Sequence, residues 1–98
     1  MTTYLKNTIN ILQRLKPTLA SLYYVDTIGL FGSIVRDDFI PDSSDVDIVV
    51  NFTQPIGIEF VDLSYFLEKE LNRKVDIVSF KGLKEKYLKE IEKDIVYV

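Results

Sequence analysis

Two aspartates, Asp45 and Asp47, have the types and spacing best suited to chemistry in this sequence. They are separated by one residue at the start of an apolar segment, residues 45–52. If that segment is a β-strand, side chains two apart share a face, and their Cα atoms lie roughly 7 Å apart. The intervening apolar residues then face the other way, toward a core: Val46, Ile48 and Val50. Two carboxylates on one face could hold one or two hard cations such as Mg²⁺ or Mn²⁺. The alternative is that Asp45 ends a loop and Asp47 lies on a solvated face.

A third carboxylate, Asp76, stands in a second apolar segment, residues 74–80, which we predict to be a strand. If this strand lies beside the strand at 45–52, Asp76 can join the first two carboxylates. Three carboxylates on adjacent strands would suit a two-metal site that clamps a phosphoryl group. The alternative is an isolated aspartate on an edge strand.

Gly32 and Ser33 follow directly after the apolar segment 25–31. Glycine lets the backbone approach a phosphate closely, the serine adds a hydroxyl, and a following helical turn would offer free backbone N–H groups. A plain turn is the alternative, because neither a Walker A loop nor a G-x-G-x-x-G pattern is present. Arg36, three residues further on, could pair with a triphosphate or could neutralise the neighbouring Asp37 and Asp38.

The elements that must position these residues follow from the spacing of apolar side chains. Helices are predicted at 4–16, 58–72 and 83–95, strands at 25–31, 45–52 and 74–80, a helical turn at 33–38, and loops at 37–44 and 54–57. Pro17 is predicted to end the first helix or to open a second short one that reaches about Leu22. This order of elements predicts an α/β sheet covered by helices. We expect a single domain over residues 1–98.

Histidine and cysteine are both absent from the 98 residues. The absence of cysteine excludes a disulfide, a thiol nucleophile and a zinc finger, and the absence of histidine excludes a Ser-His-Asp triad and an imidazole base. Carboxylates must therefore do most of the work of any catalysis, and any metal would be a cation that prefers oxygen ligands.

The net charge of −3 is unevenly distributed. Residues 1–35 carry +2, residues 36–65 carry −6 and residues 66–98 carry +1. No basic stripe is available to follow a phosphate backbone, so we expect no direct binding of nucleic acid. No run of about 18 apolar residues is present, and the first residues lack the apolar stretch and cleavage site of a signal peptide. We therefore expect a cytoplasmic protein that does not enter a membrane.

The order of these motifs resembles that of the DNA polymerase β nucleotidyltransferase superfamily, most closely the minimal nucleotidyltransferase (MNT) domains of prokaryotes. Residues 28–36 and 44–50 resemble the two core blocks of these domains, and residues 75–78 resemble the third. The resemblance extends over about residues 10–97. Two differences lie in the loop beside the phosphates: Asp37 replaces a common glycine, and the loop from Arg36 to Asp45 is one residue longer than the commonest pattern.

The resemblance implies an α+β fold, in which helices cover a small mixed β-sheet. It also implies an enzyme that transfers a nucleotidyl group from a nucleotide such as ATP. The residues that it implies for catalysis and for binding Mg²⁺, or Mn²⁺ in its place, are Asp45, Asp47 and Asp76. The residues that it implies for nucleotide binding are Gly32, Ser33, Arg36 and Ser44.

The resemblance also implies a partner. MNT domains of this kind are paired with HEPN-domain proteins in toxin–antitoxin systems, where the antitoxin attaches AMP to a tyrosine of the HEPN ribonuclease. Little chain follows Asp76 that could form an acceptor pocket, which suits a protein acceptor. Two alternatives stay open: an antitoxin that neutralises its partner by binding alone, and a transferase that acts on a small molecule or RNA.

Overall fold

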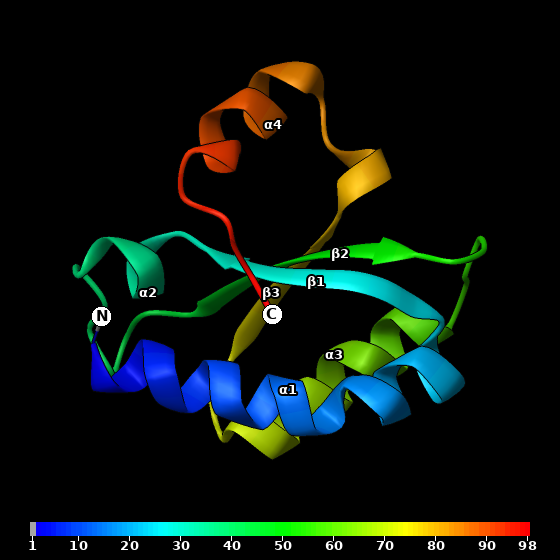
Figure 1. Cartoon of the computed structure of the whole chain (residues 1–98), viewed down its shortest axis with the longest axis horizontal. Helices are drawn as coiled ribbons and strands as arrows, with labels where there is room; N and C mark the ends of the chain where they lie inside the picture. The colour runs from blue at the N-terminus through cyan, green and yellow to red at the C-terminus, as the bar shows by residue number, and fades with distance from the viewer. Residues whose placement is uncertain (1) are drawn as a thin grey trace.

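The β-strands form a mixed sheet with the order β3-β2-β1-β4 in a computed structural model that describes residues 2–98 (Figure 1). Along the chain the elements are α1 (Thr3–Tyr23), β1 (Val25–Phe31), α2 (Ser33–Arg36), β2 (Val46–Phe52), α3 (Glu59–Leu71), β3 (Val75–Ser79), the 3₁₀ turn η1 (Phe80–Gly82), α4 (Glu85–Glu92) and β4 (Val96–Tyr97). β1 runs antiparallel to β2 and to β4, whereas β2 and β3 are parallel. The predicted α+β class, a small mixed sheet covered by helices, is confirmed.

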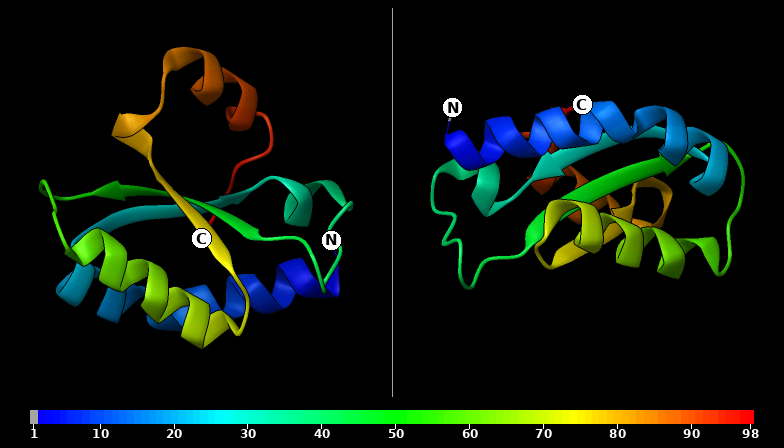
Figure 2. Two further views of the ribbon diagram at one scale, coloured as in Figure 1. Left: turned by 180° about the vertical axis from the view of Figure 1, so that it is seen from behind. Right: turned by 90° about the horizontal axis from the view of Figure 1, so that it is seen from below.

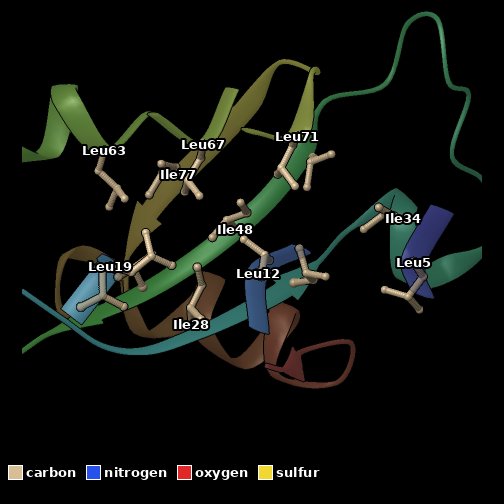
Figure 3. Close-up of a cluster of buried hydrophobic side chains, with 14 residues drawn as sticks. Leu5, Leu12, Leu19, Ile28, Ile34, Ile48, Leu63, Leu67, Leu71 and Ile77 are labelled. Atoms are coloured by element: carbon tan, nitrogen blue, oxygen red, sulfur yellow. The ribbon is translucent and has the colours of Figure 1, made fainter. Parts of the chain in front are cut away.

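Helices α1 and α3 lie side by side against one face of the sheet (Figures 1 and 2). Each presents a stripe of leucines to the strands, because residues three and four apart share one helix face. The stripes meet the inward-facing residues of β1 and β2, of which Ile28 is 1% exposed and Ile48 is fully buried. The labelled side chains of Figure 3 are Leu5, Leu12, Leu19, Ile28, Ile34, Ile48, Leu63, Leu67, Leu71 and Ile77. Burying each such side chain contributes about 1.5–3 kcal/mol.

Helix α4 lies on the other side of the sheet from α1 and α3 (Figure 1). The chain reaches it through η1 and returns through Ile95 to β4, which pairs with β1. Ile95 packs so closely over the middle of β1 that a Cβ at Gly29 would lie 2.8 Å from its Cγ2 atom. This close approach explains why a glycine occupies this buried position of β1.

The prediction that Pro17 ends the first helix or opens a second one is wrong. Helix α1 continues through it to Tyr23. Leu12 before the proline and Leu19 after it are both fully buried, whereas Pro17 itself is exposed. Because both halves of the helix pack against the same core, burial outweighs the cost of about 3 kcal/mol that a proline imposes inside a helix.

The C-terminal segment also differs from the prediction. The helix predicted at 83–95 is limited to Glu85–Glu92, and the strand predicted at 74–80 ends at Ser79, where η1 begins. Strand β4 is not predicted from the sequence, because two residues are too short to show an alternating pattern. The other predicted elements are present with ends shifted by one or two residues.

None of the helices in residues 2–98 has both the length and the apolar character needed to span a bilayer.

Candidate active site

Asp47 and Asp76 lie directly opposite each other on adjacent strands. In the parallel register of β2 and β3, Asp47 pairs with Asp76 and Ile48 with Ile77. Paired residues point to the same face of a sheet, and the isoleucines point into the core, so both aspartates face the side away from α1 and α3. Asp47 is half-buried and Asp76 is exposed. The conditional prediction that the strand of Asp76 lies beside the strand of Asp47 is confirmed.

Asp45 lies one residue before β2 and is exposed. The prediction that it belongs to the strand is wrong by one residue, since the first backbone hydrogen bond to β3 is donated by Val46 N to Lys74 O, at 2.9 Å. The structure therefore agrees with the alternative for Asp45, which ends a loop. It does not agree with the alternative for Asp47, which is half-buried rather than solvated.

Gly32 brings the end of β1 against Asp47. Its backbone, at φ 77° and ψ −151°, has a conformation that other residues rarely adopt. A Cβ at this position would overlap the Asp47 carboxylate. The pairing of Phe31 with Asp47 fixes this approach. The predicted Gly-Ser turn and the predicted carboxylates are thus brought together.

Ser33 begins the short helix α2, and the carbonyl oxygen of Gly32 accepts hydrogen bonds from the N–H groups of Val35 and Arg36, at 3.0 and 3.1 Å. The N–H groups of Ser33 and Ile34, which precede these two donors, have no acceptor inside the helix, because helical hydrogen bonds begin after the first residues. The turn therefore combines free backbone donors with a serine hydroxyl beside the carboxylates. Its predicted role in nucleotide binding stays a prediction.

Arg36 is engaged by two carboxylates. Its Nη1 atom is 3.5 Å from an oxygen of Asp94, and its Nη2 atom is 3.7 Å from an oxygen of Asp38. The sequence left two roles open for Arg36: pairing with a triphosphate, or neutralising Asp37 and Asp38. The second role is observed for Asp38. The ion pair with Asp94 also joins α2 to the segment after α4. Contact of Arg36 with a phosphate stays a prediction.

The carboxylates of this site repel one another. Burial raises the pKa of Asp47 from 3.8 to about 6, with further contributions from the negative charges of Asp76 and Asp45 and an opposing contribution from Arg36. Arg36 thus offsets only part of the effect of burial and of the two neighbouring carboxylates on the pKa of Asp47. A bound cation would relieve that repulsion.

The residues fit a hard cation in ligand chemistry but do not enclose one. Carboxylate oxygens are the ligands that Mg²⁺ and Mn²⁺ prefer. Within residues 2–98, however, no three acidic side chains converge closely enough to hold a metal ion between them. The three-carboxylate metal site of Asp45, Asp47 and Asp76 stays a prediction, and a metal here would need further oxygen ligands.

Ser44 stabilises the loop that leads to Asp45. Its Oγ accepts a hydrogen bond from the N–H of Ile40 at 2.9 Å, and its own N–H donates to the carbonyl oxygen of Ile40 at 2.8 Å. The predicted contact of Ser44 with the nucleotide stays a prediction. A polar hollow of about 330 Å³ lies beside Asp45, with Ser44, Arg73 and Lys74 among its lining residues. Arg73 is not among the residues predicted from sequence, because a single arginine at a helix end gives no signal of what it contacts.

A mixed sheet that holds two aspartates side by side next to a Gly-Ser turn is the arrangement of a nucleotidyltransferase. The chain belongs to the nucleotidyltransferase domain family, whose model matches residues 12–98. It is of the minimal nucleotidyltransferase type.

A curated relative supports this family assignment, and two solved structures share the fold. The chain is 39% identical over 90 residues to the protein adenylyltransferase MntA of Thermococcus cleftensis, with 91% of this chain and 90% of that protein covered. The fold matches the MNT antitoxin complex with a tri-AMPylated HEPN toxin from Shewanella oneidensis, at a TM-score of 0.67 and 21% identity over 97% of this chain and 71% of that chain. It also matches the toxin–antitoxin structure of MntA and HpeT, at a TM-score of 0.70 and 19% identity over 92% and 70% of the two chains. At these identities the structures show the shared fold.

Proposed function

We propose that this nucleotidyltransferase is an antitoxin that transfers AMP from ATP to a tyrosine of a HEPN ribonuclease toxin, in the cytoplasm and with Mg²⁺. The observation that carries the proposal is the pairing of Asp47 with Asp76 on parallel strands, with Gly32 against Asp47. The name of the Thermococcus relative supports AMP transfer to a protein. The tri-AMPylated toxin bound to an MNT antitoxin supports a HEPN acceptor.

In the proposed reaction, the tyrosine hydroxyl oxygen attacks the α-phosphorus of ATP. A new P–O bond forms, the bond to the oxygen that bridges the α- and β-phosphates breaks, and pyrophosphate leaves with that electron pair. The chain has no histidine, so the base proposed to accept the hydroxyl proton is a carboxylate. We assign that proton to the Asp76 carboxylate, which is exposed beside the half-buried Asp47.

The other residues bind and orient the nucleotide. Asp45 and Asp47 would hold Mg²⁺ together with phosphate oxygens, which would complete a ligand set that the protein does not enclose. When bound, Mg²⁺ neutralises charge on the phosphates and on the leaving pyrophosphate. The free N–H groups and hydroxyl of the turn at Gly32 and Ser33 would hydrogen-bond the phosphates. Arg36 would exchange its carboxylate partners for a phosphate.

The outer edge of the sheet favours a protein acceptor. β3 is an edge strand, so Asp76 can be approached from the side that β2 does not occupy. The charge of −6 over residues 36–65 would repel a nucleic-acid backbone. These features support a folded protein partner over an RNA acceptor.

The test uses ATP labelled at the α-phosphate, Mg²⁺ and, as candidate acceptor, the HEPN protein that the proposal expects to be encoded beside this chain. We expect label on the HEPN protein with the wild type and at least about 100-fold less with the Asp45→Asn, Asp47→Asn double variant, since both metal ligands are lost. Chelation with EDTA should stop the reaction, and Mg²⁺ or Mn²⁺ should restore it. Mass spectrometry then identifies the acceptor, whose Tyr→Phe variant should take no label. An Asp26→Asn variant, which changes an exposed carboxylate on β1, is the matched control.

Two negative outcomes are distinguishable. If no label is transferred but wild type and double variant both bind the HEPN protein, the chain is an antitoxin that acts by binding. If neither transfer nor binding occurs, the proposed antitoxin function is wrong, and transfer to a small molecule or RNA becomes the hypothesis to test.

A further inference from the structure

Arg73 links three parts of the molecule next to the candidate site. It lies in the turn between α3 and β3. Its guanidinium carbon is 5.2 Å from the ring centroid of Tyr4 at the start of α1 and 5.2 Å from that of Phe39. The two rings lie 5.5 Å apart. Nη1 of Arg73 also donates a hydrogen bond of 2.6 Å to the carbonyl oxygen of Pro41.

Two of these contacts hold the loop at residues 37–45, which joins α2 to β2 and ends with Asp45. The hydrogen bonds of Ser43 and Ser44 to Ile40 lie inside the loop, so they shape it without attaching it to the rest of the molecule. A polar hollow of about 330 Å³ lies between loop residues 41–45 and the turn at 72–74. Side-chain packing is therefore incomplete at this junction, and Arg73 bridges its two sides.

We propose that Arg73 is a positioning residue for nucleotidyl transfer, which fixes the loop and thereby holds Asp45 beside Asp47 and Asp76. The proposal rests on the proposed function for its catalytic part. Asp45 lies outside β2 and is exposed, so the sheet ladder does not fix its carboxylate. A metal ligand must be held within about 0.5 Å of its working position, which requires support from residues behind it.

The chemistry of the contact favours arginine over lysine. A guanidinium is planar, so it can stack on aromatic rings and still donate an N–H in its own plane to a carbonyl. An ammonium could keep the positive charge near the rings, but it would lose the planar stack. Arg73→Lys is therefore expected to retain part of the effect, and Arg73→Met to lose it.

The test compares Arg73→Met and Arg73→Lys with wild type by two measurements that need no catalysis. Hydrogen exchange should be at least about 10-fold faster in the loop of Arg73→Met, with α1 and β1 unchanged, because the lost contacts are local. Binding of Mn²⁺, measured by the loss of its free EPR signal, should weaken by about 10-fold. Arg73→Lys should give loop exchange rates and a Mn²⁺ affinity between those of wild type and Arg73→Met. Arg14→Met, which changes an exposed arginine on α1, should match wild type in both measurements.

Activity supplies a third measurement. In Arg73→Met the metal concentration for half-maximal AMP transfer should rise about 10-fold, and kcat at saturating metal should recover to within about threefold of wild type. A loss of folded protein would instead lower kcat without changing the metal dependence.

The outcomes separate this proposal from the proposed function. If the wild type transfers no AMP, the proposed function fails, and loop exchange still decides whether Arg73 fixes the loop. The proposal is overturned if Arg73→Met leaves loop exchange or Mn²⁺ affinity at the wild-type value, or if exchange rises equally throughout the chain. If Arg73→Met does not fold, Arg73→Lys is measured in its place, with smaller changes expected in loop exchange and in Mn²⁺ affinity. Wild-type values in Arg73→Lys would then overturn the proposal.

Discussion

At the scale of single residues, Asp47 carries a cost that a neutral side chain would not. Its pKa is raised from 3.8 to about 6 in the folded protein, first by burial and then by Asp76 and Asp45. Between these pH values the folded state binds more protons than the unfolded state, so the free energy of unfolding falls as pH rises. The shift of the Asp47 pKa from 3.8 to about 6 corresponds to about 3 kcal/mol in the free energy of unfolding. Solvent screening at this half-buried carboxylate reduces the expected loss of stability to about 1 kcal/mol.

Asp47→Asn should therefore be more stable than wild type by about 1 kcal/mol at pH 7.5 without metal, and nearly equal to it at about pH 4. Urea unfolding at both pH values measures this difference. Asp26→Asn, at an exposed position on β1, should show no comparable gain. A gain that is the same at both pH values would show that removal of charge is not its cause.

Gly32 has no side chain because the Asp47 carboxylate occupies that space. In Gly32→Ala the new methyl group would overlap the carboxylate, and the residue would keep a φ of 77° that alanine tolerates poorly. We expect a loss of about 1–3 kcal/mol in the free energy of unfolding, together with loss of AMP transfer. Gly57→Ala is the matched control, since a Cβ there meets no atom within 4 Å, and its effect should stay within about 0.5 kcal/mol. Equal losses in the two variants would rule out the overlap as the cause.

At the scale of elements, helix α1 tolerates a proline at a position where it loses a hydrogen bond. Pro17 has no N–H to donate to the carbonyl oxygen of Gln13. Pro17→Ala restores that donor, but it also gives the unfolded chain more freedom, worth about 0.4–1 kcal/mol. We expect a net gain of about 2–2.5 kcal/mol in the free energy of unfolding. Thermal and urea unfolding measure it, with Gln13→Ala on the same helix as control. A loss of stability would mean that restriction of the unfolded chain dominates.

The same helix shows how far the sequence alone predicts local structure. The apolar spacing predicts a helix here, and the propensity of Pro17 predicts its end. Only tertiary packing decides between them, because Leu12 and Leu19 are buried in one core. The other predicted helices and strands are found because their patterns are long enough to read, whereas β4 exists only through its pairing with β1.

The residues of the candidate site can be predicted from the sequence, but their arrangement in space cannot. The types and spacing of Asp45, Asp47 and Asp76 indicate the chemistry, and Gly32 marks the turn. The parallel register that sets Asp47 opposite Asp76 is a property of two segments far apart in the chain, so neither segment encodes it alone. The contacts of Arg73 with Tyr4 and Phe39 likewise depend on the assembled fold.

At the scale of the whole molecule, the two faces of the sheet have different tasks. Helices α1 and α3 close one face over the core, and α4 lies on the other side of the sheet (Figure 1). The register of β2 and β3 places Asp47 and Asp76 on that other face as well. Within Glu85–Glu92 no residue is buried, and its internal ion pair, Lys89 with Glu85 at 3.6 Å, is exposed. Such pairs contribute about 0.3–0.5 kcal/mol. Two contacts attach the chain just after the C-terminal end of α4: the ion pair of Arg36 with Asp94 and the pairing of β4 with β1.

This arrangement predicts that the molecule opens in parts. Segments with few buried apolar contacts open at a lower free energy than the core. Amides of α4 should therefore exchange at least about 100-fold faster than those of β1 and β2. Helix α3 is the internal control, because it buries Leu63, Leu67 and Leu71 and should exchange with the core. Native-state hydrogen exchange followed by mass spectrometry measures all of these segments in one experiment. If α4 instead exchanged as slowly as α3, α4 would be part of the cooperative core, and the prediction that the molecule opens in parts would be wrong.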